Sequence, residues 1–177
     1  MYIYLLCIQR YANHTVPPSE IEAGANYHFF KEGVKPTWED VVNTQGGKWD
    51  LTVGAGDRGN LDQWWTTVLM GLVGELLDID GDVICGAVFS RRKKGDRLAV
   101  WTRMKDDRVR NLGVAKRLLE ILDLQGGRIK FDLQYKHHND TMKSGRSYNA
   151  TAHLGKDDVM KPEVLEDDET YPPLPKV

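Results

Sequence analysis

Two tryptophans of this 177-residue chain are candidates for a binding site, and one of them, Trp38, stands among polar neighbours rather than in an apolar stripe. Trp38 follows Pro36 and is followed directly by Glu39 and Asp40, and Trp101 lies at the end of a predicted strand. An exposed indole ring can stack on a nucleobase. A carboxylate beside it can accept hydrogen bonds from the N1 and N2 donors of guanine. The pattern therefore predicts a site for an aromatic base that presents two donors.

Cations that could bind phosphate are concentrated in and beside one predicted hairpin. Lys48 opens a different predicted strand, and the residues of the hairpin are Arg91, Arg92, Lys93, Lys94 and Arg97. Basic side chains of this kind bind phosphate oxygens. The alternative is that the run is only a solvated turn, and the sequence leaves it open.

Other patterns that resemble functional motifs lack the structure they would need. The glycines between residues 54 and 59 fit a dinucleotide-binding fingerprint, but that fingerprint requires a parallel βαβ unit, and the neighbouring strands are predicted to be antiparallel. His137 and His138 are expected in a solvated loop, because adjacent residues of an extended segment point to opposite faces and cannot easily share a metal ion. Cys7 and Cys85 have no metal-site spacing. We expect no catalytic site, cofactor or metal.

The composition is that of an ordinary soluble domain. Hydrophobic residues make up 41 % and charged residues 28 %, and 24 basic against 26 acidic residues leave a net charge of −2. The two cysteines favour a reducing compartment, so we expect a cytoplasmic protein. The apolar run over residues 1–8 is too short to cross a membrane, and no membrane partner is expected. Residues 155–177 carry seven acids and three lysines, and we expect a disordered tail there.

The apolar periodicity predicts an α+β fold with an antiparallel sheet. A helix from Leu61 to Leu77, capped by Asn60, carries apolar residues at steps of three and four, and a second helix spans residues 107–122. The tryptophans assigned to the core are Trp49, Trp64 and Trp65. The opposite face of the first helix carries Gln63, Thr66, Thr67, Met70 and Gly74. Strands are predicted over residues 27–31, 48–53, 83–89, 97–102 and 128–135.

Several motifs, in order along the chain, resemble the translation initiation factor 4E family, which binds the messenger RNA cap. The resemblance runs from about Asn13 to Gly145 and is carried by residues 27–40, 46–49, 65–75, 85–92, 95, 101–102 and 143–145. It implies a curved antiparallel sheet with long helices on its convex face, and a 7-methylguanine ring held on the concave face between two tryptophans. The domains expected on this basis are a non-matching segment 1–12, a cap-binding domain 13–154 that lacks the family's first strand, and the tail 155–177.

The resemblance also assigns roles to single residues. Trp38 would form one side of the base sandwich, Glu39 would hold the guanine N1 and N2 donors, and Trp101 would touch the N7-methyl group. The residues implied for the cap phosphates are Arg92, Arg97, Lys48 and Lys143. The family's second sandwich tryptophan lies upstream, and no tryptophan precedes Trp38 here. We therefore expect an incomplete or misjoined N-terminus, with a diverged paralogue as the alternative, and weakened cap binding.

The implied partners are capped messenger RNA, the initiation scaffold subunit and repressor proteins. The two kinds of protein bind the helical face, and the residues implied for that contact are Thr66, Thr67, Met70 and Gly74. The expected function is non-enzymatic recognition of the cap at the start of translation. One alternative is a translational regulator of the same fold with weak or lost cap binding, and another is a dinucleotide-dependent oxidoreductase.

Overall fold

The computed structural model describes residues 11, 14–78, 82–123, 132–138 and 152–155. The strands are β1 (Asn26–Phe30), β2 (Gly47–Val53), β3 (Ile84–Ser90), β4 (Asp96–Thr102), β5 (Asp132–His137) and β6 (Ala152–Gly155). The helices are the short 3-10 helix η1 (Ala55–Asn60), α2 (Leu61–Val73) and α3 (Arg108–Asp123). None of the helices within these ranges is long and apolar enough to cross a membrane.

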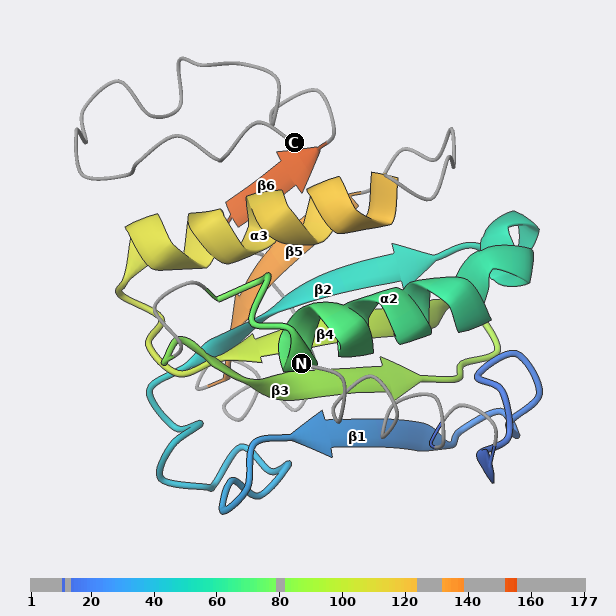
Figure 1. Ribbon diagram of the computed structural model, residues 1–177, viewed down its shortest axis with the longest axis horizontal. Coiled ribbons are helices and arrows are strands. Elements are labelled where there is room, and N and C mark those ends of the chain that lie inside the picture. Colours follow the sequence, from blue (N-terminus) through green and yellow to red (C-terminus); the bar gives the residue numbers. More distant parts are fainter. Residues whose placement is uncertain (1–10, 12–13, 79–81, 124–131, 139–151, 156–177) are drawn as a thin grey trace.

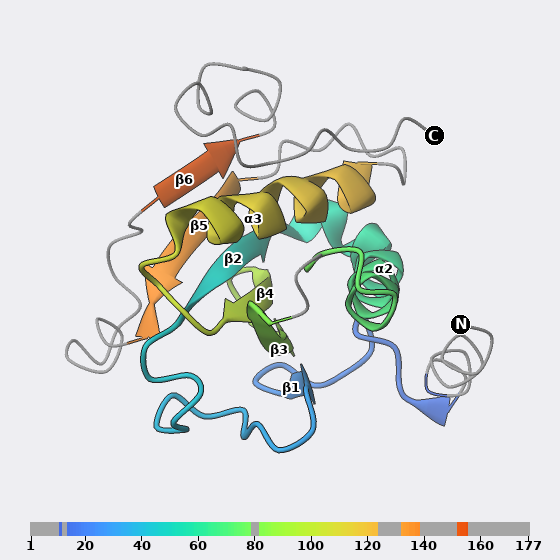
Figure 2. The ribbon, with the colours of Figure 1, turned by 60° about the vertical axis from the view of Figure 1, so that its left-hand side comes forward.

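The described strands form one six-stranded sheet in the order β1-β3-β4-β2-β5-β6. Every neighbouring pair is antiparallel, and β3 and β4 form the predicted hairpin. Helices α2 and α3 lie across the same face of the sheet (Figure 1). The segment between β1 and β2 loops out on the side away from α2 (Figure 2). The predicted α+β class, with helices covering one face, is confirmed.

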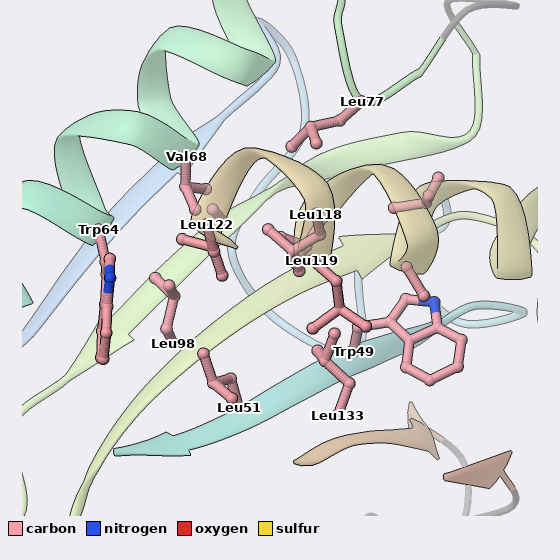
Figure 3. Close-up of a cluster of buried hydrophobic side chains, with 14 of the residues drawn as sticks. Trp49, Leu51, Trp64, Val68, Leu77, Leu98, Leu118, Leu119, Leu122 and Leu133 are labelled. Carbon is pink, nitrogen blue, oxygen red and sulfur yellow. The ribbon is translucent and has the colours of Figure 1, made fainter. Parts of the chain in front are cut away.

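The core lies between the helices and the sheet. Side chains alternate between the two faces of each strand, and those on the helix side fill the core. In β2, Trp49, Leu51 and Val53 are 1–2 % exposed and face the helices. Trp64 of α2 and Leu118 of α3 close over them (Figure 3). Burying a large apolar side chain contributes about 1.5–3 kcal/mol, so this cluster fixes the sheet against the helices. The intervening residues of each strand then face the other side.

Helix α2 ends four residues earlier than its apolar periodicity predicts. Gly74 follows its last residue, and Glu75 has a positive φ of 55°. That left-handed conformation turns the chain out of the helix, so Leu76, expected in the core stripe, is 56 % exposed. At the other end Asn60 holds the cap position without a side-chain hydrogen bond, because η1 runs directly into α2.

The glycine-rich connection after β2 does not belong to a dinucleotide-binding unit. It forms η1, and β2 is antiparallel to both of its neighbours, β4 and β5. The fingerprint requires a parallel βαβ crossover. The oxidoreductase alternative is therefore wrong for this topology.

Candidate functional site

A cleft of about 510 Å³ opens on the sheet face that the helices leave uncovered. Its walls come from β1 to β4 and from the segment that precedes β2. Six of the seven residues predicted to bind base or phosphate line it, namely Trp38, Glu39, Lys48, Arg92, Arg97 and Trp101. The seventh, Lys143, lies outside the described residues.

The loop that presents Trp38 is held in shape by two side chains. Asn43 is fully buried, and its Nδ2 donates to the carbonyl oxygens of Lys35 and Thr37, at 2.8 Å each. The carboxylate of Asp40 accepts the backbone N–H of Lys35 at 3.2 Å and that of Val42 at 2.9 Å. The Oδ1 of Asn43 has no partner among the described residues, but the bonds from its Nδ2 and those to Asp40 hold the loop without a ligand.

Trp38 and Glu39 project differently from this loop. Trp38 is half-buried, rather than exposed as its polar neighbours predict, because it packs against a small apolar cluster that includes Val88 and Trp101. It still lines the cleft. Glu39 is exposed, and it forms no hydrogen bond or ion pair with the described residues. A half-buried indole ring and an unengaged carboxylate therefore stand side by side at the cleft.

Two packed rings lie beside the loop, and one of them, Trp101, lines the cleft. Trp101 is 4 % exposed, with the ring of Phe30 edge-on at 5.4 Å and the ring of His138 at 4.1 Å. His138 is 1 % exposed, and its backbone N–H donates to the carbonyl oxygen of Gly46 at 3.2 Å. Burial lowers the pKa of His138 to about 3, with the charge of Lys48 adding to the effect.

The prediction of a solvated loop for the two histidines is wrong. His137 is the last residue of β5, and His138 follows it beneath Trp101. In the pairing of β5 with β2, His137 lies opposite Gly47 and Lys136 lies opposite Lys48. Because side chains alternate along a strand, His138 faces the same side of the sheet as Lys48, which lines the cleft. Within the described residues, no group of three or more His, Cys, Asp or Glu side chains could hold a metal ion.

Three cations line the other end of the cleft. The side chains of Lys48 and Arg97 form no hydrogen bond or ion pair with the described residues. Arg92 is held by Asn26, whose Oδ1 accepts from Nη2 at 2.7 Å, and by the carbonyl oxygen of Ala25 at 3.2 Å. Burial lowers the pKa of Lys48, while the charge of Asp50 opposes that shift. An ammonium group in this position would gain from an anionic ligand.

The hairpin that carries Arg92 and Arg97 turns around a fully buried carboxylate. Asp96 is 0 % exposed. Its Oδ2 accepts from Arg91 Nη1 at 2.8 Å and from Arg58 Nε at 3.1 Å, and its Oδ1 accepts the backbone N–H of Arg92 at 2.9 Å. The guanidinium of Arg91 is therefore paired with Asp96 and stabilises the turn, whereas the side chain of Arg97 lines the cleft and can bind a ligand.

A buried ion pair that sequence reasoning missed joins Asp50, which lines the cleft, to Lys136 of β5. Lys136 Nζ donates to Asp50 Oδ2 at 2.7 Å, and the two residues are 8 % and 2 % exposed. Asp50 lines the cleft, and its Oδ1 has no partner among the described residues. Polar alternation along β2 places Lys48 and Asp50 on one face, and this signal could have indicated that Asp50 faces the site.

The face predicted for protein partners lies on α2, on the other side of the sheet. Met70 is 40 % exposed, Gly74 is exposed and Thr66 is half-buried, with its hydroxyl donating to the carbonyl oxygen of Asp62 at 2.8 Å. Thr67 is only 9 % exposed, so its assignment to the open face is wrong. It lies one turn from Trp64 and from Gly71, which are both buried.

Cys85 is a buried thiol and not a reactive one. It is 0 % exposed, and burial raises its pKa to about 11. Thiol reactivity requires the thiolate. Cys7 lies outside the described residues.

The sequence matches one protein family over most of its length. The family model of Eukaryotic initiation factor 4E matches residues 8–153. Eukaryotic translation initiation factor 4E1 of Drosophila melanogaster is 41 % identical over 130 residues, which cover 73 % of this chain and 49 % of that protein. Eukaryotic translation initiation factor 4E-3 of Caenorhabditis elegans is 40 % identical over 139 residues, covering 73 % and 52 %. The chain spans about half the length of these curated relatives.

Solved structures show the same fold. A complex of C. elegans eIF4E-3 with the 4E-binding protein Mextli and a cap analog has a TM-score of 0.73 and 36 % identity, covering 84 % of this chain and 79 % of that one. A Schistosome eIF4E complexed with m7GpppG and 4E-BP has a TM-score of 0.74 and 29 % identity, covering 84 % and 80 %. The similarity therefore extends over both the sheet and the helices.

Proposed function

The chain belongs to the eukaryotic initiation factor 4E family, and on that premise we propose that it binds the 7-methylguanosine cap of messenger RNA and recruits the initiation scaffold to start translation. The observation that carries the proposal is the cleft, because its wall joins an indole, a free carboxylate and unpaired cations. Relatives of this fold have been solved with a cap analog and with m7GpppG. We propose a binding protein rather than an enzyme.

Each part of the cap meets a matching group. Methylation at N7 makes the guanine ring cationic, and a cationic ring is attracted to the face of Trp38. The carboxylate of Glu39 accepts from guanine N1 and N2, and Trp101 lies under the methyl group. Lys48, Arg92 and Arg97 bind the phosphate bridge. We place Lys143 at the phosphates as well, on the strength of the family motif alone.

The protein partners would bind on α2. Solved relatives carry 4E-binding proteins such as Mextli and 4E-BP. In this chain Met70 offers an exposed apolar contact, and Gly74 lets a partner helix approach closely. A buried Thr67 contributes little to such a surface. We therefore propose that Thr66, Met70 and Gly74 form the contact with the scaffold and with repressor proteins.

Fluorescence titration with 7-methyl-GTP and with GTP tests cap recognition. Cation–π attraction contributes about 1–2 kcal/mol, so the methylated nucleotide should bind roughly 5- to 30-fold more tightly. Trp38→Leu should weaken both nucleotides, because either base can stack on the indole, but it should weaken 7-methyl-GTP more and so abolish most of that difference. Equal affinity for the two nucleotides, or no binding of either, would refute the proposal.

A further inference from the structure

A second cavity, of about 450 Å³, lies on the outer side of the basic hairpin. It shares Arg92 and Arg97 with the cleft, so the two hollows meet at these side chains. Lys93 and Lys94 complete a set of four cations in its wall, and the rest of the wall is Ala23, Gly24 and Gly95. Its lining contains no acidic side chain.

The shape of this cavity is fixed by the fold. The backbone N–H of Gly24 donates to the carbonyl oxygen of Arg91 at 2.9 Å. In return, the backbone N–H of Arg91 donates to the carbonyl oxygen of Ala25 at 3.0 Å. Asp96 holds the turn from inside. Gly24 has a φ of 107°, and a Cβ atom placed there would meet nothing within 4 Å, so the space beside it is open. The lysines are exposed on a turn that is itself anchored.

The chemistry of the wall suits a phosphate chain better than bases. Only aliphatic, glycine and cationic groups line it, and no aromatic ring is present there to stack a base. Cations without base-stacking groups bind a nucleic acid backbone irrespective of sequence. A ligand whose phosphates contact Arg92 and Arg97 in the cleft meets Lys93 and Lys94 next.

We propose that this second cavity binds the phosphodiester backbone of the nucleotides that follow the cap. The inference rests on the proposed function, because it needs the cap to be seated in the cleft. Arg92 and Arg97 then mark the boundary between the two parts of one RNA ligand. The lysines add affinity for the RNA body and leave recognition of the cap unchanged.

The test compares the dinucleotide cap m7GpppG with an oligoribonucleotide that carries the same cap and seven further nucleotides. In the wild type the longer ligand should bind more tightly. Each contact to a single-strand phosphate contributes a salt slope of about 0.7, or roughly fivefold at 0.1 M salt. The double variant Lys93→Gln, Lys94→Gln should therefore lose roughly 25-fold in affinity for the long ligand, and its salt slope should fall by about 1.4. Its affinity for m7GpppG should stay within about twofold, because the cap phosphates are assigned to other cations.

The matched control is Lys105→Gln with Arg108→Gln, which removes the same charge from the far side of the sheet beside α3. It should keep the preference for the long ligand. Equal losses for the two ligands in the lysine variant, or no loss for either, would overturn the inference. So would an unchanged long-ligand affinity together with lysine-dependent binding of polyglutamate, which would mark an acidic-peptide site. If wild type fails to bind m7GpppG, the proposed function fails and this inference falls with it.

Discussion

Asp50→Asn should lower the free energy of unfolding by about 3–5 kcal/mol, the usual cost of removing one partner of a buried ion pair. The geometry explains why the cost is large. Lys136 is 8 % exposed, and its Nζ lies 2.7 Å from the carboxylate that the substitution neutralises. Lys48 also loses the nearby negative charge that supports its protonated form. The charges of Lys48 and Lys136 would then oppose each other without the counter-charge of Asp50.

Urea denaturation followed by intrinsic fluorescence measures the effect. For a chain of this size, 1 kcal/mol shifts the Tm by about 2–4 °C, so thermal scans should show a fall of roughly 6–20 °C. The comparison variant is Asp50→Leu with Lys136→Met, which replaces the pair by apolar side chains. It should be close to the wild type in stability, because well-packed apolar groups often replace a buried pair without loss. A loss below 1 kcal/mol in the single variant, or an equal loss in the double variant, would refute the reasoning.

Further predictions concern the ligand, the pH and the thiol. Glu39→Gln should weaken 7-methyl-GTP binding by roughly 5- to 150-fold, since a bidentate contact to a base contributes about 1–3 kcal/mol. Asp40→Asn should instead lower the Tm with a smaller effect on the ligand, and equal affinity losses in fluorescence titrations would show that the guanine contact is misplaced. Because the pKa of His138 is about 3 when folded and 6.5 unfolded, the unfolded chain takes up the proton first as the pH falls. Stability should therefore drop by up to about 1.4 kcal/mol per pH unit as the pH falls from 6.5 toward 5, above the range in which carboxylates titrate. His138→Gln should remove that slope in urea titrations, and a slope that persists between pH 6.5 and 5 refutes the assignment. Iodoacetamide at pH 8 should modify Cys85 in urea but not in the native Cys7→Ser chain, and native modification would contradict a thiol pKa of about 11.

Patterns that are local in the sequence predicted most of the strands and the cleft. Alternation along the chain is a property of single strands, so the five predicted strands recur in the structure within a few residues at each end where these are described. Trp38 and Glu39 stand in one short loop, and their polar setting is visible without the fold. The antiparallel hairpin brings Arg92 and Arg97 together for the same reason.

The features that escaped prediction depend on contacts between distant segments. The ion pair joins residues that are 86 positions apart, and only the register of β5 against β2 places Lys136 beside Asp50. His138 is buried because Trp101 of another strand covers it. Thr67 is buried because the face of α2 that packs against the rest of the protein is wider than its stripe of apolar residues. The spacing of apolar residues gives the direction of that face but not its width.

The loop around Trp38 has a consequence for the kinetics of binding. Asn43 and Asp40 hold its backbone by hydrogen bonds that need no ligand, so association does not have to order a flexible segment. A preformed site loses less conformational entropy on binding, and it avoids the slow step of a conformational change. Nucleotides that differ at the base should therefore associate at similar rates and differ mainly in how long they remain bound. Asn43→Ala, by loosening the loop, should slow association for all of them alike.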